Sequence, residues 1–307
     1  MSFSSGPCLG TMFFGTTVPP ERAYAVLDRY VERGGRLLDT ANNYAFWADG
    51  GTGDESEALL GRWLTERGHR DELLIATKIG ARPRPGGGGT RQSLGLGAAT
   101  VREQLTGSLA RLGTDRVDLV YAHIDDHATP LAETLGAFDA LVRDGLVGRV
   151  AVSNYTVDRL QAAIALTAER GWAPVAAVQL RASYLTPAPE ADFGVQILLD
   201  DAHGELAAAH DLTIFGYSAL LGGAYTRSDR PLPADYDHPG TAAQLGALRA
   251  TADRLEMTPN QVVLGWLAAQ GVIPVLGASG VEHLDEALDT PPLDAQALAD
   301  LDAARHP

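Results

Sequence analysis

Short apolar runs alternate along the chain with longer stretches in which apolar residues recur at helical spacing. The apolar runs are continuous, which is typical of strands that are buried on both faces. We predict eight strands, at 9–14, 36–40, 73–78, 117–123, 148–154, 175–181, 212–217 and 272–277. A helical stretch follows each of them, which indicates parallel strands joined by helices. The predicted fold is therefore an α/β protein, a single-domain (β/α)8 TIM barrel over residues 1–307.

Helix signals support this alternation. The first helical stretch places apolar side chains along one face, at Ala23, Val26, Leu27, Tyr30 and Val31. Two later stretches begin with a Thr and, three residues on, a Glu or Gln, which is typical of a capping box. These are Thr100 with Glu103, and Thr258 with Gln261. Pro259, which follows Thr258, would occupy the first helical position, where proline is favoured. We therefore expect a helix to begin at each of these two places.

Composition and charge narrow the function classes. The chain has 45% hydrophobic residues, enough for a sizeable core, and a formal net charge of -15. Nucleic-acid binding draws on clustered Lys and Arg, so we expect no nucleic-acid partner. The one cysteine, Cys8, cannot form an internal disulfide, and no Cys or His spacing indicates a structural metal. No signal-peptide pattern or bilayer-spanning apolar run is visible, so we expect a cytoplasmic protein with no membrane partner.

Polar side chains stand at the ends of three successive apolar strands. Asp39, Lys78 and His123 end the second, third and fourth predicted strands, and Tyr44 follows Asp39 by five residues. Each alone has an ordinary structural interpretation, as an ion pair, a core histidine or a rim aromatic. The C-terminal ends of barrel strands, however, converge on one rim, where three Gly-, Pro- or Asp-rich loops at 45–53, 80–97 and 220–240 also lie. The sequence therefore predicts an acid–base site at this mouth.

This grouping favours reduction of a carbonyl group. A free phenol has a pKa of about 10 and is a poor acid near neutrality. We expect Lys78 to lower the pKa of Tyr44, and Asp39 to keep Lys78 charged. Tyr44 and His123 would then both hydrogen-bond to the oxygen that gains negative charge during reduction. No side chain supplies a hydride, so a nicotinamide cofactor is required.

The motifs around these residues resemble those of the aldo-keto reductase family, over residues 9–288. They are Leu38-Asp39-Thr40-Ala41 followed by Tyr44, then Gly53, Glu55, Ser56, Glu57 and Leu60-Gly61, then Ile75-Ala76-Thr77-Lys78, and finally the run from Val117 to His123. The resemblance implies that Asp39, Tyr44, Lys78 and His123 form the catalytic tetrad, with Tyr44 as the acid. It also implies a small-molecule carbonyl substrate and NADPH as cofactor, with NADH as the alternative.

The resemblance also implies cofactor contacts at other strand ends. Ser153, Asn154 and Gln179 are similar to the trio that holds the nicotinamide carboxamide, and Tyr217 to the aromatic that stacks on the ring. The other counterparts are Gly10, Thr11, Met12 and Asp39 near the ring, Ser218, Leu220 and Gly222 in the pyrophosphate loop, Gly277 and Ser279 in the final phosphate turn, His283 near the 2'-phosphate and Glu286 at the adenine.

The chain departs from the family pattern in two places. NADPH-using members usually place Lys or Arg around the adenosine 2'-phosphate, whereas residues 280–287 offer only His283. A neutral imidazole binds phosphate less well than a guanidinium, so the preference for NADPH is open, and Arg227 is the other candidate. Little sequence precedes Leu9, so we expect the N-terminal hairpin that plugs the barrel bottom in this family to be shortened or absent.

Other features have two interpretations. Ser153 and Asn154 either cap the following helix or bind the cofactor. Phe46 and Trp47 form either a lid over the substrate or simple loop packing. The cluster at 125–127, Asp-Asp-His, has metal-ligand chemistry but is more typical of a solvated loop, and we assign no metal.

Two other functions compete with carbonyl reduction. One is an aldolase-type barrel with Lys78 as a Schiff-base nucleophile, which Asp39 disfavours because it keeps the amine protonated. The other is a catalytically weak regulatory subunit that senses the redox state of a bound cofactor, which the intact set of four polar residues disfavours. The sequence leaves the physiological carbonyl, the reaction direction and the oligomeric state open.

Overall fold

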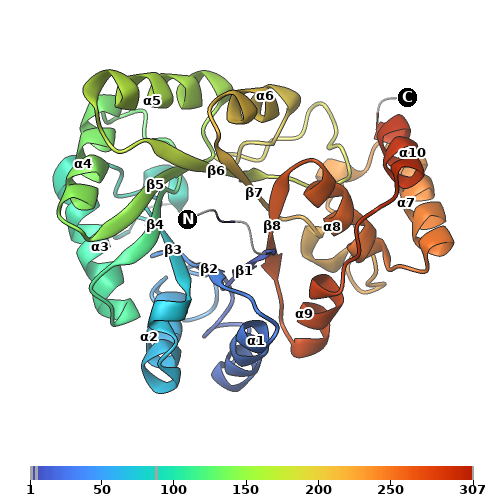
Figure 1. The fold of residues 1–307 in the computed structure, drawn as a ribbon, viewed down its shortest axis with the longest axis horizontal. Coiled ribbons are helices and arrows are strands. Elements are labelled where there is room, and N and C mark those ends of the chain that lie inside the picture. The colour runs from blue at the N-terminus through green and yellow to red at the C-terminus, as the bar shows by residue number, and fades with distance from the viewer. Residues whose placement is uncertain (1–2, 4–5, 87–88, 306–307) are drawn as a thin grey trace.

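The computed structural model describes residues 3, 6–86 and 89–305. Eight parallel strands close into a barrel in sequence order, with β8 paired to β1, and helices surround it (Figure 1). The strands are β1 (Cys8–Gly10), β2 (Leu37–Asp39), β3 (Leu74–Ile79), β4 (Val117–Ala122), β5 (Val147–Ser153), β6 (Val175–Arg181), β7 (Thr213–Tyr217) and β8 (Val272–Gly277). The predicted (β/α)8 barrel is thereby confirmed.

Seven strands match their predicted ranges to within one residue at each end, whereas β1 ends at Gly10, four residues early. The chain turns there, because the N–H of Phe14 donates back to the carbonyl of Thr11 at 2.9 Å. Gly10 itself allows β1 to approach β8, since a Cβ at this position would lie 2.9 Å from a methyl group of Val275.

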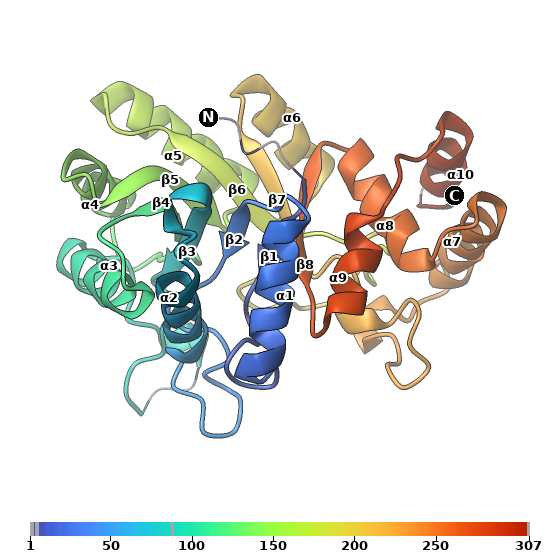
Figure 2. The ribbon, with the colours of Figure 1, turned by 60° about the horizontal axis from the view of Figure 1, so that its bottom comes forward.

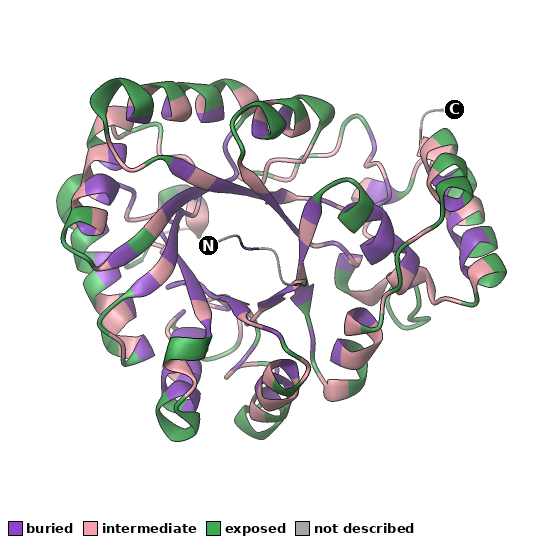
Figure 3. Cartoon of the chain, in the orientation of Figure 1, coloured by how far each residue is buried: buried purple, intermediate pink, exposed green. Residues whose placement is uncertain are grey.

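The outer layer consists of α1 (Pro20–Glu32), α2 (Glu55–Arg67), α3 (Ala98–Leu112), α4 (Leu131–Arg143), α5 (Val157–Arg170), α6 (Asp201–Ala209), α7 (Thr241–Leu255), α8 (Pro259–Ala269), α9 (Val281–Leu288) and α10 (Ala295–Arg305). Both α7 and α8 lie between β7 and β8, and α10 packs against α7 at the outer edge of the molecule (Figure 1). Buried residues line the strands and the helix faces that meet them, and exposed residues cover the outer faces (Figure 3). None of the helices in the described part of the chain is long and apolar enough to cross a membrane.

The helix signals were read correctly in two of three cases. Of the apolar residues predicted along one face of α1, four are buried and Val31 is half-buried. Thr258 and Gln261 form the expected capping box at the start of α8. The capping box predicted at Thr100 is wrong, because α3 already begins at Ala98. The N–H of Ala98 donates instead to the carboxylate of Glu133 in α4, at 3.0 Å. A contact from another helix thus replaces the local cap.

The end of the barrel at which the strands begin is filled by apolar side chains. Phe3 packs there with Cys8 and Phe215, its ring centroid 5.6 Å from that of Phe215, and the guanidinium of Arg149 lies 4.1 Å over the Phe3 ring. No hairpin precedes β1 among the residues that the structure describes, as the sequence predicts. The opposite end carries the long loops after β2, β3 and β7, which extend to the same side in Figure 2. That end is the mouth, and it holds the candidate site.

Candidate active site

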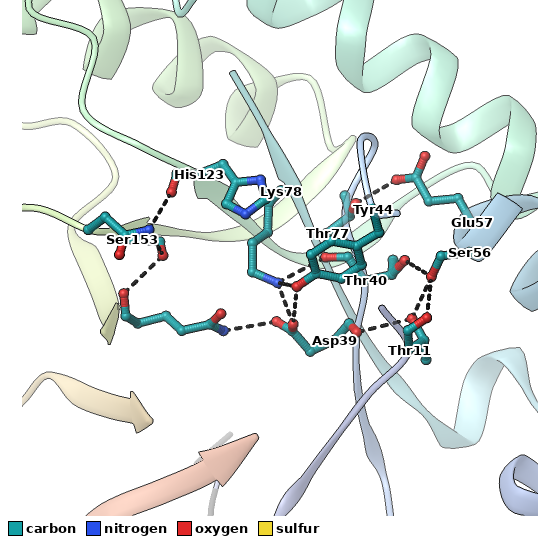
Figure 4. A network of polar contacts seen from close by, with 12 residues as sticks. Thr11, Asp39, Thr40, Tyr44, Ser56, Glu57, Thr77, Lys78, His123 and Ser153 are labelled. Atoms are coloured by element: carbon teal, nitrogen blue, oxygen red, sulfur yellow. Dashed lines mark hydrogen bonds and ion pairs between the residues drawn. The ribbon is translucent and has the colours of Figure 1, made fainter. Parts of the chain in front are cut away.

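Four predicted site residues meet at the mouth of the barrel (Figure 4). Asp39 and Lys78 come from the ends of β2 and β3, His123 directly follows β4, and Tyr44 reaches in from the loop after β2. The side chains of Asp39 and Lys78 form an ion pair and are each only 1% exposed. The rings of Tyr44 and His123 meet edge to face with centroids 5.9 Å apart.

The ammonium of Lys78 uses all three of its donors within this cluster. It donates to Oδ2 of Asp39, to the carbonyl of Thr40 at 3.1 Å and to the hydroxyl of Tyr44 at 2.5 Å. Burial lowers the pKa of Lys78, and the adjacent Asp39 carboxylate opposes that shift. The geometry therefore fixes the cation beside the phenol oxygen.

Tyr44 is held as a neutral phenol. Its hydroxyl donates to Oδ2 of Asp39 at 3.0 Å while it accepts from Lys78. Burial, followed by the Asp39 carboxylate, raises the pKa of Tyr44 well above its ordinary value. The expectation that Lys78 would lower this pKa is thus wrong, because burial and the neighbouring carboxylate raise it.

His123 is held neutral at its place beside Tyr44. Burial, and secondarily the Lys78 cation, lowers the pKa of His123 well below its ordinary value. Its Nδ1 atom is buried and has no hydrogen-bond partner among the described residues. A neutral imidazole retains one N–H, which suits it to donate a hydrogen bond rather than to carry charge.

Polar side chains of α2 anchor the ends of β1, β2 and β3 through hydrogen bonds. Ser56 lies between Thr11 and Thr40, with hydroxyl oxygens 2.8 Å from each. Glu57 is fully buried, accepts from Thr77 at 2.5 Å and pairs with Arg111 at 2.7 Å. The side chain of Thr11, a predicted cofactor contact, is therefore engaged by Ser56 (Figure 4).

A connected set of side chains continues the mouth across β5, β6 and β7. Gln179 donates to Oδ1 of Asp39 at 3.0 Å, and Ser153 donates to the carbonyl of Gln179 at 2.9 Å. Asn154 adopts a left-handed backbone, with φ 58°, and its Oδ1 accepts from the hydroxyl of Tyr217 at 2.7 Å. The structure thus connects the three residues that the resemblance assigns to the carboxamide with Tyr217, the residue that it assigns to stacking on the ring.

The alternative that Ser153 and Asn154 cap α5 is wrong. The N-cap of α5 is Thr156, whose hydroxyl accepts from the N–H of Arg159. The amide nitrogen of Asn154 donates to the carbonyl of His123 at 3.0 Å, which ties the ends of β4 and β5 together. Ser153 and Asn154 therefore belong to the mouth and not to the helix.

The loop that follows β7 has an unusual backbone. Within 218–223, positive φ angles occur at Ser218 (59°), Leu221 (48°), Gly222 (69°) and Gly223 (95°). Within the described part of the chain, the backbone N–H groups of Ala219 and Leu220 have no acceptor. Loops that turn unpaired N–H groups to one side form concave sites for anions. We call residues 218–223 the β7 loop.

The turn after β8 contains further predicted contacts. Ser279 and His283 bond to each other at 3.1 Å, and Glu286 accepts from Thr258 at 2.6 Å. Gly277 is exposed, and a Cβ there would meet nothing within 4 Å.

A cavity of about 270 Å³ lies between α1 and the start of α9. It is lined by Ser279 and His283, by Glu282, and by Arg22 of α1. Sequence reasoning missed Arg22, since it lies more than 250 positions away from the turn and carries no local signal.

The remaining predicted positions follow β1, β2 and β4. Phe46 and Trp47 contact each other edge to face with centroids 5.0 Å apart, and Trp47 is 55% exposed. Met12 is half-buried after β1. Asp125 pairs with Arg159 of α5 at 2.9 Å, which gives it a structural partner.

Comparisons with known proteins identify the family of this chain. A model of the Aldo/keto reductase family matches residues 8–306. "Aldo-keto reductase str7" of Strobilurus tenacellus is 30% identical over 290 residues, which cover 89% of this chain and 77% of the relative. "Uncharacterized oxidoreductase YrpG" of Bacillus subtilis is 29% identical, covering 92% and 85%. "Aldo-keto reductase yakc [NADP(+)]" of Schizosaccharomyces pombe is 27% identical, covering 91% and 80%. The match spans nearly the whole chain, and this protein belongs to the aldo/keto reductase family.

Proposed function

We propose that this protein reduces an aldehyde or ketone to an alcohol with a reduced nicotinamide cofactor, and that Tyr44 donates the proton. Family membership and the names of its relatives support an oxidoreductase. The observation that carries the finer proposal is the cluster in which Lys78 bridges Asp39 and the hydroxyl of Tyr44.

The residues of the mouth fit a nicotinamide dinucleotide. Ser153, Asn154 and Gln179 would hold the carboxamide, and the Tyr217 ring would support the nicotinamide. The unpaired N–H groups of the β7 loop would donate hydrogen bonds to the diphosphate oxygens. When bound, the reduced nicotinamide supplies the hydride that no side chain can provide.

The chain's own residues bind the carbonyl and supply its proton. The carbonyl oxygen accepts hydrogen bonds from Tyr44 and from the neutral ring of His123, and both strengthen as the oxygen gains charge. The hydroxyl of Tyr44 turns from Asp39 to this oxygen and transfers its proton there, which forms the alcohol O–H bond. The Lys78 ammonium, 2.5 Å from the phenol oxygen, stabilises the phenolate left behind.

The geometry argues against Lys78 as a Schiff-base nucleophile. Burial lowers its pKa, which would favour a free amine, but its nitrogen is directed at three acceptors of the protein. The side chain is 1% exposed, so a substrate carbonyl has no approach to the nitrogen without breaking the ion pair.

We propose NADPH as the cofactor, with NADH as the alternative. Arg22 and His283 beside the turn after β8 support NADPH, as does the name of the yakc relative. Glu282 lines the same cavity, and a carboxylate there suits a ribose hydroxyl better than a phosphate. Dissociation constants for the two cofactors, measured on the wild-type protein, decide between them.

The direct test mixes purified protein with NADPH or NADH and a panel of aldehydes, quinones and ketosugars. We expect oxidation of the cofactor, followed as loss of its absorbance, with at least one carbonyl. Absence of both turnover and cofactor binding would contradict the proposal. Tight cofactor binding without turnover on any carbonyl would favour the regulatory subunit instead.

A further inference from the structure

Arg181 is a site residue that the sequence pattern did not single out. It is the last residue of β6, two positions after Gln179. Side chains two apart on a strand share a face, and Gln179 points to Asp39 in the barrel interior. Arg181 therefore lies one layer above Gln179, at the mouth, where it pairs in register with Tyr217 of β7.

The guanidinium of Arg181 is held rigidly. It lies 4.5 Å from the ring centroid of Phe193 and 5.7 Å from that of Tyr236. Its Nε donates to the hydroxyl of Tyr236 at 3.1 Å, and its Nη1 donates to Oε1 of Gln196 at 2.8 Å. Stacking and two hydrogen bonds from different loops orient the group, so little entropy is lost when a ligand binds to it.

This half-buried cation has no carboxylate partner. None of the ion pairs between described residues includes Arg181, and its hydrogen-bond acceptors are all neutral. The Nη2 atom has no acceptor within the described part of the chain, which leaves two N–H donors unused. A partly buried charge without a counter-charge is unfavourable, and this one is positioned to receive an anion.

The β7 loop lies beside this guanidinium and offers further hydrogen-bond donors to an anion. Nη1 of Arg181 is also 3.4 Å from the hydroxyl oxygen of Ser218, the first residue of the loop. The unpaired N–H groups of Ala219 and Leu220 follow directly. Arg227 is the nearest other arginine along the chain, but it is exposed and already paired with Asp229 at 2.6 Å.

We propose that Arg181 binds the diphosphate of the nicotinamide dinucleotide, together with the backbone of the β7 loop. The inference rests on the proposed function and adds the cation that the loop itself lacks. A guanidinium matches phosphate oxygens in a two-pronged geometry, which a lysine cannot reproduce. The contact is made equally to NADPH and NADH, because both contain the diphosphate.

The test measures binding by calorimetry, without catalysis. Its ligands are ADP-ribose, which contains the diphosphate but no nicotinamide, and adenosine, which contains neither. We expect R181Q to weaken ADP-ribose binding on the order of 10- to 100-fold, since a hydrogen-bonded charge pair is lost. R181K should recover part of this affinity, and adenosine should bind all proteins alike. R230Q is the matched control, because Arg230 is exposed in the segment between β7 and α7, and it should bind ADP-ribose like the wild type.

Two further measurements guard against a folding artefact. The thermal midpoint of each variant shows whether the mouth is intact. Y236F removes the acceptor of Nε but keeps the cation, so we expect a smaller loss of ADP-ribose affinity than in R181Q. If R181Q fails to fold, the graded losses in R181K and Y236F carry the test.

The outcomes separate this inference from the proposed function. If the wild type binds NADPH and ADP-ribose but R181Q binds them equally well, the inference fails and the function stands. If R181Q also had a raised KM for succinic semialdehyde, which carries a carboxylate, but not for butyraldehyde, which lacks one, Arg181 would be assigned to a substrate carboxylate. If the wild type binds no dinucleotide, both proposals fail.

Discussion

The two halves of the barrel mouth differ in how their charges are balanced. On the side of β2 to β4, the Lys78 cation is paired with Asp39, and Tyr44 bonds to both. On the side of β6 to β8, Arg181 faces the β7 loop without a carboxylate among the described residues, and backbone N–H groups there lack acceptors. In the first half the cation is balanced by a carboxylate, whereas in the second half a bound anion would have to balance the cation.

This difference separates the roles of the two halves. A complete cluster holds its groups in position before the substrate arrives, which is what acid catalysis requires. A cation that lacks a counter-charge contributes the most binding free energy when a ligand of opposite charge binds. Substitutions in the first half should therefore change turnover or stability, and substitutions in the second half should change cofactor affinity.

The largest effect is expected for Tyr44→Phe. Without the phenolic proton, kcat/KM should fall by about 10² to 10⁴, the usual contribution of a positioned acid. Steady-state kinetics with the best carbonyl of the panel measure this. The dissociation constant of NADPH should stay at its wild-type value, because the variant leaves the β6 to β8 half unchanged. Turnover at the wild-type rate would show that Tyr44 is not the acid.

Asp39→Asn should mainly affect stability. It leaves the Lys78 cation buried without its carboxylate, and breaking such a pair costs about 3–5 kcal/mol in the free energy of unfolding. Urea denaturation gives the value. The exposed pair of Asp229 with Arg227 provides the control, and Asp229→Asn should unfold at the same urea concentration as the wild type. Equal effects of the two substitutions would contradict the comparison.

Cofactor binding should stabilise the wild type and Tyr44→Phe by the same amount. At a cofactor concentration about 100 times the dissociation constant, the expected gain is about 2.7 kcal/mol. Thermal unfolding with and without NADPH measures it for both proteins. A gain that disappears in the variant would mean that the two halves are coupled and that the phenol contributes to binding.

The smallest effect is the pH dependence that His123 adds to stability. Burial lowers its pKa in the folded state, so the unfolded chain binds the proton more readily. The stabilising contribution is present above the unfolded pKa of about 6.5 and is lost as the pH falls below it, by up to about 1.4 kcal/mol per pH unit. Urea midpoints between pH 7.5 and 5.5 should therefore fall more steeply for the wild type than for His123→Gln. Parallel curves would show that the ring is not held neutral.

Sequence reasoning located the first half better than the second. Asp39, Lys78 and His123 stand at the ends of apolar runs, where a polar side chain is conspicuous, and the rule that parallel strand ends converge brings them together. The direction of the Tyr44 pKa shift was not accessible in this way. It depends on burial and on the 3.0 Å contact with Asp39, and neither follows from spacing along the chain.

The second half depends on contacts between distant segments. Arg181 was visible as the polar end of a strand and shares its face with Gln179, so the period of two was the available signal. The orientation of its guanidinium depends on Phe193 and Gln196 in one loop and on Tyr236 in another. No local sequence pattern predicts the conformations of these loops. The capping box predicted at Thr100 failed for the same reason, because Glu133 of another helix binds the first N–H of α3.

The exposed indole of Trp47 gives the mouth a built-in optical reporter. Of the four tryptophans, Trp63 and Trp266 are buried and Trp172 is half-buried, whereas Trp47 is 55% exposed. A collisional quencher such as acrylamide should therefore reach Trp47 first and remove the red edge of the emission spectrum. A molecule that settles in the mouth and shields this indole would restore that emission, so occupancy can be followed in the unlabelled protein.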